Sequence, residues 1–166
     1  MLINSAGLSL HDTTMLDGAT ASWEQMMQTN VIAVAVMTRE VVAAMRRHST
    51  ACHVVNISSM SAYRIPKFAG GAFYAATKHA LRCISDGTRL EAQQQGLDLR
   101  VTCLSPGVVE TEFYAVRHAG DPNGGAGYDF EPLHAKHVTQ ALLYALGAPL
   151  GVNVDDVIVR SMAQPL

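Results

Sequence analysis

Residues 56–78 read NISSMSAYRIPKFAGGAFYAATK, and the fold that we expect for the chain follows from this stretch. It begins inside an apolar run, residues 53–57, which has the character of a buried strand and ends at two serines. A glycine-containing loop follows, and then a predicted helix whose first turns carry Tyr74 and Lys78. Residues four apart lie on one helical face, so the phenol and the ammonium should point into the same space. Hydroxyls at the carboxyl end of a strand beside such a helix predict an active site at the edge of a parallel sheet.

These residue types suit a proton transfer. A phenol has a pKa near 10, which makes it a poor acid or base at neutral pH. The ammonium of Lys78 should favour the phenolate of Tyr74 and thereby lower the pKa of Tyr74. Such a tyrosine can give a proton to a carbonyl oxygen while hydride arrives at the carbon, or perform the reverse step on an alcohol. A general acid placed in this way contributes roughly 10²–10⁴-fold, and a serine hydroxyl bonded to the same oxygen would orient it.

Three further segments accompany this pair in a fixed order. NSAG occurs at residues 4–7, Asn30 lies within a predicted helix, and SPGVVET occurs at residues 105–111. Together with Tyr74-x-x-x-Lys78 and the upstream serines, they resemble the classical short-chain dehydrogenase/reductase family, whose patterns are N-N-A-G, a helix asparagine, Y-x-x-x-K and P-G-x-x-x-T. The serine in NSAG departs from the family pattern. Tyr-x-x-x-Lys alone is a weak signal, but the four matches cover nearly the whole chain.

The resemblance implies a role for each matching residue. The family places its active serine last in the Ile-Ser-Ser run, which indicates Ser59, and leaves Ser58 as a strand-end hydroxyl that caps backbone groups. Asn30 has two interpretations: a polar residue tolerated in a helix, or a residue whose backbone carbonyl holds a water in a proton relay to Lys78. The expected catalytic residues are Ser59, Tyr74, Lys78 and Asn30. The expected cofactor-binding residues are Asn4, Tyr74, Lys78, Val108, Val109, Glu110 and Thr111.

We expect one α/β domain over residues 1–166, the C-terminal part of a Rossmann-like, doubly wound parallel sheet. Strands and helices should alternate, with right-handed crossovers. Ser22 and Gln25 have the spacing of a capping box at the start of the first helix. Gly96 is expected as the C-cap of the second helix, and Pro106 should not continue the third strand. The predicted strands are 1–3, 52–57, 97–104 and 154–159, and the predicted helices are 23–47, 73–95 and 134–146.

Two glycine patterns bear on the cofactor. Residues 113–130 become aromatic and then glycine-rich, which predicts a mobile loop, and the resemblance implies that this loop binds the substrate. No glycine-rich turn stands between a strand and a helix, where it would bind a pyrophosphate. The residue that distinguishes NAD from NADP is absent as well. The sequence is therefore expected to be a family member truncated at its fourth strand, without the N-terminal Gly-rich βαβ units.

Composition narrows the class of partner. With 166 residues, the chain is long enough for a domain with a core, and its formal net charge of −2 predicts neither a nucleic acid nor an anionic membrane as partner. Its three cysteines have no metal-ligand spacing and should remain reduced, as in a cytoplasmic protein. No apolar run reaches transmembrane length. His134 and His137 lie three apart without a third ligand, so we expect no metal site.

Two functions are consistent with the sequence. The first is an oxidoreductase that interconverts an alcohol and a carbonyl, with NADP as cofactor and NAD as the alternative. Details of the SPGVVET segment and of the loop before Tyr74 resemble the branch with farnesol dehydrogenases and 3-keto and 17-keto steroid reductases, which implies a lipid- or steroid-like substrate. The second is a non-catalytic chain that acts only by pairing with another subunit. In the family the two long helices form a homodimer interface, so a homodimer is expected.

Overall fold

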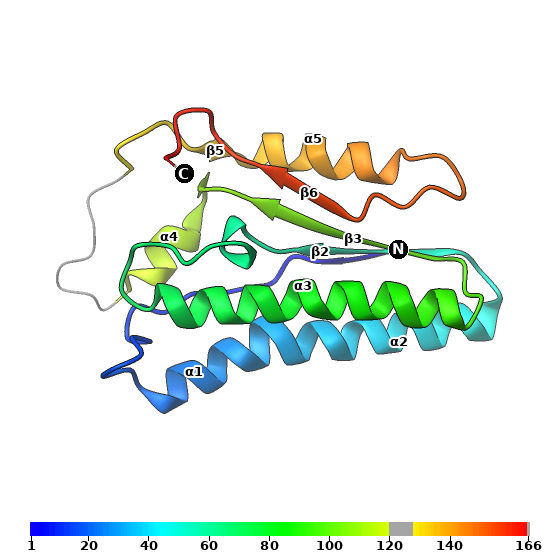
Figure 1. Ribbon diagram of the computed structural model, residues 1–166, viewed down its shortest axis with the longest axis horizontal. Coiled ribbons are helices and arrows are strands. Elements are labelled where there is room, and N and C mark those ends of the chain that lie inside the picture. The colour runs from blue at the N-terminus through cyan, green and yellow to red at the C-terminus, as the bar shows by residue number, and fades with distance from the viewer. Residues whose placement is uncertain (120–127, 166) are drawn as a thin grey trace.

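The computed structural model describes residues 1–119 and 128–165, and its centre is a four-stranded, fully parallel sheet in the order β1-β2-β3-β6 (Figure 1). The strands are β1 (Leu2–Asn4), β2 (Cys52–Ile57), β3 (Leu99–Pro106) and β6 (Asp156–Val159). The helices are α1 (Thr20–Met27), α2 (Ala33–His48), α3 (Gly71–Gln94), α4 (Glu112–Arg117) and α5 (Ala135–Leu146). A two-stranded sheet pairs β4 (Val109–Glu110) with β5 (Leu133–His134).

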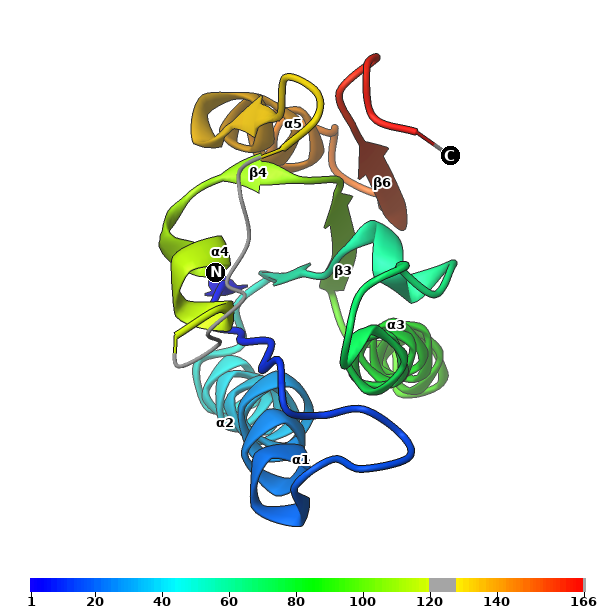
Figure 2. The same cartoon turned by 90° about the vertical axis from the view of Figure 1, so that its left-hand side faces the viewer.

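Helices cover both faces of the sheet. Figures 1 and 2 show α1, α2 and α3 on one side and α5 on the other. The contacts agree, since α2 packs on β1 and β2, α3 packs on β3, and α5 packs on β3 and β6. This arrangement confirms the predicted α/β fold with a parallel sheet and helices on both faces.

The middle of the sheet is a continuous apolar layer. Val54 and Val55 of β2 are fully buried, and so is Val101 of β3, which pairs with Val54. A strand that is apolar along its whole length is typical of a parallel sheet covered on both faces. The predicted strand 52–57 is confirmed with both of its ends.

The first long helix differs from the prediction in two ways. Ser22 does not cap it: Ala19 is the N-cap, and Ser22 lies inside α1, where its hydroxyl donates to Asp12 Oδ2 at 2.7 Å. The capping-box prediction was wrong because the side chain of Asp12, distant in sequence, binds this hydroxyl. The helix also widens into a π-helical turn, η1 (Gln28–Ile32), between α1 and α2. Asn30 lies in this turn, and such turns are frequent at functional sites.

The third strand runs further than predicted. Pro106 is its last residue and pairs with Val159 of β6, although proline has no N–H for the ladder. The missing donor is supplied one residue later, because Gly107 N donates to the carbonyl of Val159 at 2.7 Å. The strand therefore ends at the proline and not before it.

The remaining elements agree with the sequence more closely. Helix α3 begins two residues earlier than predicted, and its C-cap is Gln95 and not Gly96, which is the next residue and has a positive φ of 62°. Of the predicted loop 113–130, the first part forms α4, and residues 120–127 lie outside the described part of the chain. The three cysteines are all free thiols. In the described part of the chain, no helix combines the length and apolar character that a membrane crossing requires.

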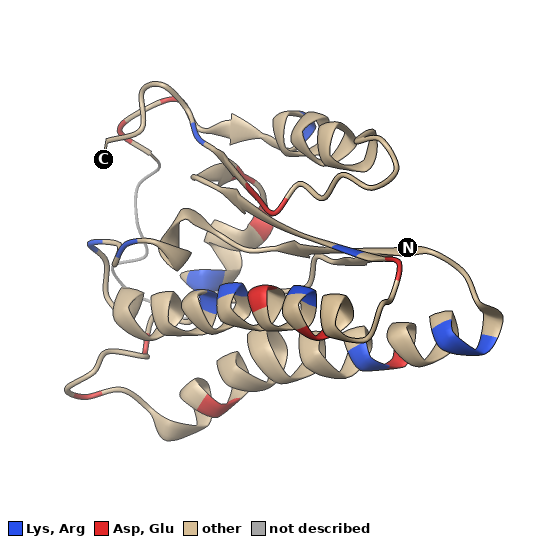
Figure 3. Ribbon diagram, turned by 45° about the vertical axis from the view of Figure 1, so that its right-hand side comes forward, with Lys and Arg blue, Asp and Glu red and all other residues tan. Residues whose placement is uncertain are grey.

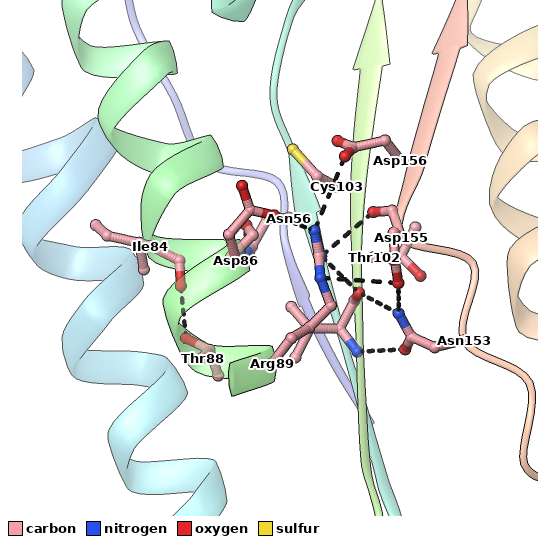
Figure 4. Close-up of polar contacts among 12 residues, drawn as sticks. Asn56, Ile84, Asp86, Thr88, Arg89, Thr102, Cys103, Asn153, Asp155 and Asp156 are labelled. Carbon is pink, nitrogen blue, oxygen red and sulfur yellow. Dashed lines mark hydrogen bonds and ion pairs between the residues drawn. The ribbon is translucent and has the colours of Figure 1, made fainter. Parts of the chain in front are cut away.

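Arg89 of α3 joins this helix to β3 and to the start of the edge strand β6 (Figure 4). Its guanidinium donates to the backbone carbonyl of Val101 at 3.0 Å and pairs with Asp86 at 2.5 Å. Weaker ion pairs reach Asp155 at 3.7 Å and Asp156 at 3.8 Å, at the start of β6. Elsewhere on α2 and α3, Lys and Arg outnumber Asp and Glu (Figure 3).

Replacement of Arg89 by methionine keeps the aliphatic packing but removes these bonds. We expect Arg89→Met to lower the free energy of unfolding by about 1–3 kcal/mol, since a charged donor to a carbonyl is lost. Arg39→Met is the matched control, because Arg39 pairs only with the exposed Glu40 and is itself 72% exposed, so its loss should cost at most about 0.5 kcal/mol. Urea unfolding of both variants measures the difference. Equal shifts would show that Arg89 does not join α3 to the strands.

Candidate active site

A cavity of about 710 Å³ lies at the carboxyl ends of β1, β2 and β3. Parallel strands end at one edge of the sheet, so the loops that follow them meet there. Gly7 lines the cavity after β1, Ser58 and Ser59 line it after β2, and Gly107 and Val108 line it after β3. The first turns of α3 add Tyr74 and Lys78 to the same walls. The structure thus brings together the segments that the sequence marked as candidates.

Ser59 and Tyr74 form the centre of this site. Ser59 is the N-cap of the short 3₁₀ helix η2 (Met60–Ala62), and its hydroxyl accepts the N–H of Ser61 at 3.1 Å. The side chain of Ser59 also acts on the phenol of Tyr74, whose pKa it lowers, and Tyr74 is 6% exposed. The capping role that was expected for Ser58 therefore belongs to Ser59. Within the described residues, the buried hydroxyl of Ser58 has no hydrogen-bond partner.

Burial decides the protonation of Tyr74. It raises the pKa of Tyr74 to about 12, while the side chain of Ser59 and the charge of Arg117 act in the opposite direction. The prediction that Lys78 lowers this pKa is wrong for the structure, because burial outweighs the charges around the phenol. At neutral pH the phenol is therefore protonated, which is the form that can donate a proton.

Lys78 is buried beside the tyrosine, with an exposed fraction of 4%. Its ammonium donates to the backbone carbonyl of Ile57 at 3.1 Å and lies 5.8 Å from the ring centroid of Tyr74. Burial lowers the pKa of Lys78 to about 8. A Cβ added to Gly7 would lie 3.4 Å from the ammonium, so the loop after β1 passes close to this charge.

The side chain of Asn30 binds the loop after β1 through two hydrogen bonds. Its side-chain amide accepts the N–H of Leu8 at 2.9 Å and donates to the carbonyl of Leu8 at 2.8 Å. The amide nitrogen also lies 3.1 Å from the hydroxyl of Thr77, the residue before Lys78. Asn30 is 1% exposed, so its amide forms a buried link between η1, the loop after β1 and α3. The side chain thus has a structural role, and the proton relay through its backbone carbonyl stays a prediction.

Asn4 belongs to a second buried chain of amides and hydroxyls. Its side chain donates to Asn56 Oδ1 at 2.8 Å, and Asn56 in turn donates to the hydroxyl of Ser85 at 2.8 Å. Ser85 donates back to a carbonyl of its own helix. The chain connects β1, β2 and α3 directly beneath the cavity. It fixes Asn4, and a direct contact from Asn4 to a cofactor stays a prediction.

Residues 108–111 are the remaining cofactor-binding candidates, and most of them form another part of the cavity wall. Val108 N donates to Gln164 Oε1 at 3.0 Å, and Val109 begins the short strand β4. Glu110 forms an ion pair with His134 at 3.0 Å. The hydroxyl of Thr111 accepts the N–H of Phe113 at 3.4 Å and caps α4. Val108, Val109 and Thr111 line the cavity, whereas Glu110 points its carboxylate at β5.

His134 and His137 lie three residues apart at the start of α5, where they take part in a helix cap. The ring of His137 accepts the backbone N–H of His134 at 3.1 Å, which caps the start of α5. No group of three possible metal ligands occurs within residues 1–119 and 128–165.

Part of the cavity wall is formed by aromatic side chains and an arginine that the sequence did not indicate. Arg117 of α4 is 4% exposed, donates to the carbonyl of Ala69 at 2.5 Å and stacks on Phe68, with 3.4 Å to the ring centroid. The ring of Tyr74 lies between Phe68 and Phe113, at 6.4 and 5.9 Å. No motif marked these residues, because each contact joins segments that are distant in sequence. Only the aromatic composition of the predicted loop could have indicated them.

Comparison with known proteins agrees with this geometry. The bovine dehydrogenase/reductase SDR family member 11 is 39% identical over 165 residues, and farnesol dehydrogenase from Aedes aegypti is 28% identical over 165 residues. These alignments cover 98% and 99% of this chain but 64% of each relative. The chain thus spans less than two thirds of the length of these relatives. Similarity to the farnesol dehydrogenase accords with one part of the expected branch, and the steroid reductases stay a prediction.

A solved structure is similar over almost the whole chain. The closed form of serine dehydrogenase complexed with NADP⁺ superposes with a TM-score of 0.87 at 30% identity, covering 99% of this chain and 66% of that one. The family described as short chain dehydrogenase matches residues 1–121, which include the candidate serine, tyrosine and lysine. On this evidence, together with the fold and the arrangement of the cavity, the chain belongs to the short chain dehydrogenase family.

Proposed function

We propose that this chain supplies the catalytic site of an NAD(P)-dependent oxidoreductase that interconverts an alcohol and a carbonyl compound. The observation that carries the proposal is that Ser59 and Tyr74 line the same cavity, with the serine side chain near enough to the buried phenol to lower its pKa. It places two hydroxyl donors where one carbonyl oxygen could accept from both. The buried ammonium of Lys78 lies on the same helix, one turn further along.

The residues present fit the nicotinamide end of the cofactor. An ammonium has three N–H donors, and one of those on Lys78 goes to Ile57, so the others can reach a ribose hydroxyl from the cavity wall. Backbone groups of Val108 and Val109, at the end of β3, border the same space. The nicotinamide supplies or accepts the hydride when bound. NADP is the cofactor that we propose, with NAD as the alternative, since the serine dehydrogenase structure holds NADP⁺.

Proton transfer follows from the ionisation of the site. The pKa of Tyr74, raised to about 12, keeps its phenol protonated at neutral pH. As negative charge develops on a carbonyl oxygen, Tyr74 donates its proton and Ser59 stabilises the same oxygen. The nearby ammonium of Lys78 compensates part of the phenolate charge that remains.

The cavity wall indicates the class of substrate. Phe68, Phe113 and Tyr114 border the site of Tyr74, and Leu142 of α5 lies on the opposite wall. A volume of about 710 Å³ lined in this way suits a bulky apolar carbonyl or alcohol, such as a lipid or a steroid. The name of the Aedes aegypti relative, a farnesol dehydrogenase, supports an apolar alcohol.

One observation favours a second function. Helix α2 and the end of η1 expose apolar side chains: Ile32 is 45% exposed, Val36 39% and Met37 48%. Such an apolar strip along a helix can be covered by the same helix of a second copy. A non-catalytic chain that only dimerises is therefore the alternative proposal, and cofactor binding distinguishes the two.

Loss of the phenolic proton is the most direct test of the catalytic assignment. In an active protein that carries this chain, Tyr74→Phe should lower kcat roughly 10²–10⁴-fold and leave the Kd for NADPH nearly unchanged. Tyr63→Phe is the control, because the hydroxyl of Tyr63 donates to Asp156 away from the cavity. Near-normal turnover of Tyr74→Phe would refute the role of Tyr74.

The buried ammonium of Lys78 should lower the free energy of unfolding, whereas a methionine at this position should not. Its lowered pKa, about 8 against 10.5, means that the unfolded chain binds more protons, so stability should rise with pH between these values. At pH 7 the whole penalty is present. We expect Lys78→Met to raise the free energy of unfolding by about 2 kcal/mol, after the lost bond to Ile57 is deducted. The exposed Lys136→Met is the control in urea unfolding, and a destabilised Lys78→Met variant would contradict the argument.

Cofactor affinity of residues 1–166 alone is also predictable. The contacts expected within this chain reach only the nicotinamide end, and they must offset the loss of freedom on binding, about 4–15 kcal/mol. We therefore expect no saturable change in NADPH fluorescence up to about 1 mM, where about 4 kcal/mol of binding is available. Micromolar binding with carbonyl-dependent oxidation of NADPH would instead show that the 166 residues are catalytic alone, and would exclude the purely dimerising function.

A further inference from the structure

The segment that follows β6 folds back onto the end of β3. The side-chain oxygen of Gln164 accepts the N–H of Val108 at 3.0 Å. The backbone carbonyl of Gln164 accepts from Arg160 at 2.8 Å, and the carbonyl of Pro165 accepts from Arg64 at 3.2 Å. Gln164 is 9% exposed and lines the cavity. The two arginines therefore hold the backbone of this segment, and the bond from Val108 holds the side-chain amide of Gln164 in the wall of the site.

Gly107 makes room for this amide. A Cβ at position 107 would lie 2.1 Å from Gln164 Oε1 and 3.1 Å from Gln164 Cδ. Distances of this kind exclude any side chain unless the glutamine moves. Gly107 itself donates to Val159 at 2.7 Å, which fixes its backbone against β6. The glycine of the P-G-x-x-x-T segment is thus needed here for the close approach of a side chain from another segment.

The hydrogen bond between Val108 and Gln164 also determines where the chain turns after β3. Val108 is the second of the two residues between β3 and β4, and its carbonyl accepts the N–H of Leu133 at 2.9 Å. With its N–H on Gln164 and its carbonyl on β5, both backbone groups of Val108 are engaged. The direction in which Val109 enters the cavity wall follows from these two bonds.

We propose that Gln164 is a positioning residue of the active site, which fixes the backbone of residues 107–109 against the nicotinamide end of the cofactor. This inference rests on the proposed function, because it assumes that this wall borders the nicotinamide. Gln164 acts through Val108 and takes no part in the proton transfer.

Amide hydrogen exchange tests the bond without any need for activity. In residues 1–166, Gln164→Leu keeps the shape but removes the acceptor, so the exchange of Val108 N–H should accelerate about tenfold or more. Gln164→Glu keeps an acceptor oxygen beside Arg160 and Arg64 and should retain the protection. Unchanged exchange of Val108 in Gln164→Leu would overturn the proposal.

Steady-state kinetics test the consequence in an active protein that carries this chain. Gln164→Leu should raise KM for NAD(P)H about tenfold and change kcat less than about threefold, the loss expected for one hydrogen bond that acts in cofactor binding. Gln164→Glu should restore KM. An equal fall in kcat for both variants, with lowered thermal stability, would show a merely structural role and overturn the proposal.

A pair of small substitutions provides a second check. Gly107→Ala should raise KM for NAD(P)H in the unchanged protein, because the new methyl group displaces Gln164. In the Gln164→Ala background the same change should have a smaller effect, since the side-chain atoms at 2.1 and 3.1 Å are gone and only the contact with Arg160 Cβ at 3.0 Å remains. Additive effects would contradict the proposal. If the unchanged protein transfers no hydride, the proposed function fails, and the exchange rate of Val108 still decides whether the bond exists.

Discussion

The hydrogen bond from the Lys78 ammonium to the carbonyl of Ile57 joins helix α3 to the end of β2, and the geometry of the site depends on it. A buried cation needs a partner, because burial without one is costly. This requirement keeps the first turns of α3 directly above the strand end that carries Ser59. Tyr74, one turn earlier on α3, then meets the serine hydroxyl. A single buried charge thus aligns a helix, a strand and two hydroxyls.

Near this bond, two series of buried hydrogen bonds join the loop after β1 and the strands to α3. Asn30 binds both backbone groups of Leu8 and reaches Thr77. Asn4 and Asn56 continue a second series of bonds toward α3. Buried networks of this kind specify one arrangement when each member has a partner. The loop after β1 is therefore held from two directions, although it carries little apolar surface of its own.

Local patterns in the sequence predicted much of this. The apolar run of β2 and the four-residue spacing of Tyr74 and Lys78 are local features, so the strand and the shared wall could be derived from them. Contacts between distant segments could not be derived. The hydroxyl of Ser22 binds Asp12 instead of capping its helix, and the bond between Gln164 and Val108 joins residues 56 positions apart. The pKa of Tyr74 was also misjudged, because a sequence shows the neighbouring charge but not the depth of burial.

The π-helical turn between α1 and α2 makes the length of this helix as important as its composition. Each residue of an α-helix advances the chain by about 100° around the axis. A π-helical turn closes with an i→i+5 bond and so contains about one residue more than an α-helical turn. Deletion of one residue from Gln28–Ile32 would therefore let the helix continue as a regular α-helix with little rotation, and the Trp23 ring would stay near Phe73, on which it stacks at 5.6 Å. Position 30 would then adopt regular α-helical geometry, which changes the direction of the amide that binds Leu8. A deletion in this turn should thus disturb the site more than the packing of the helix.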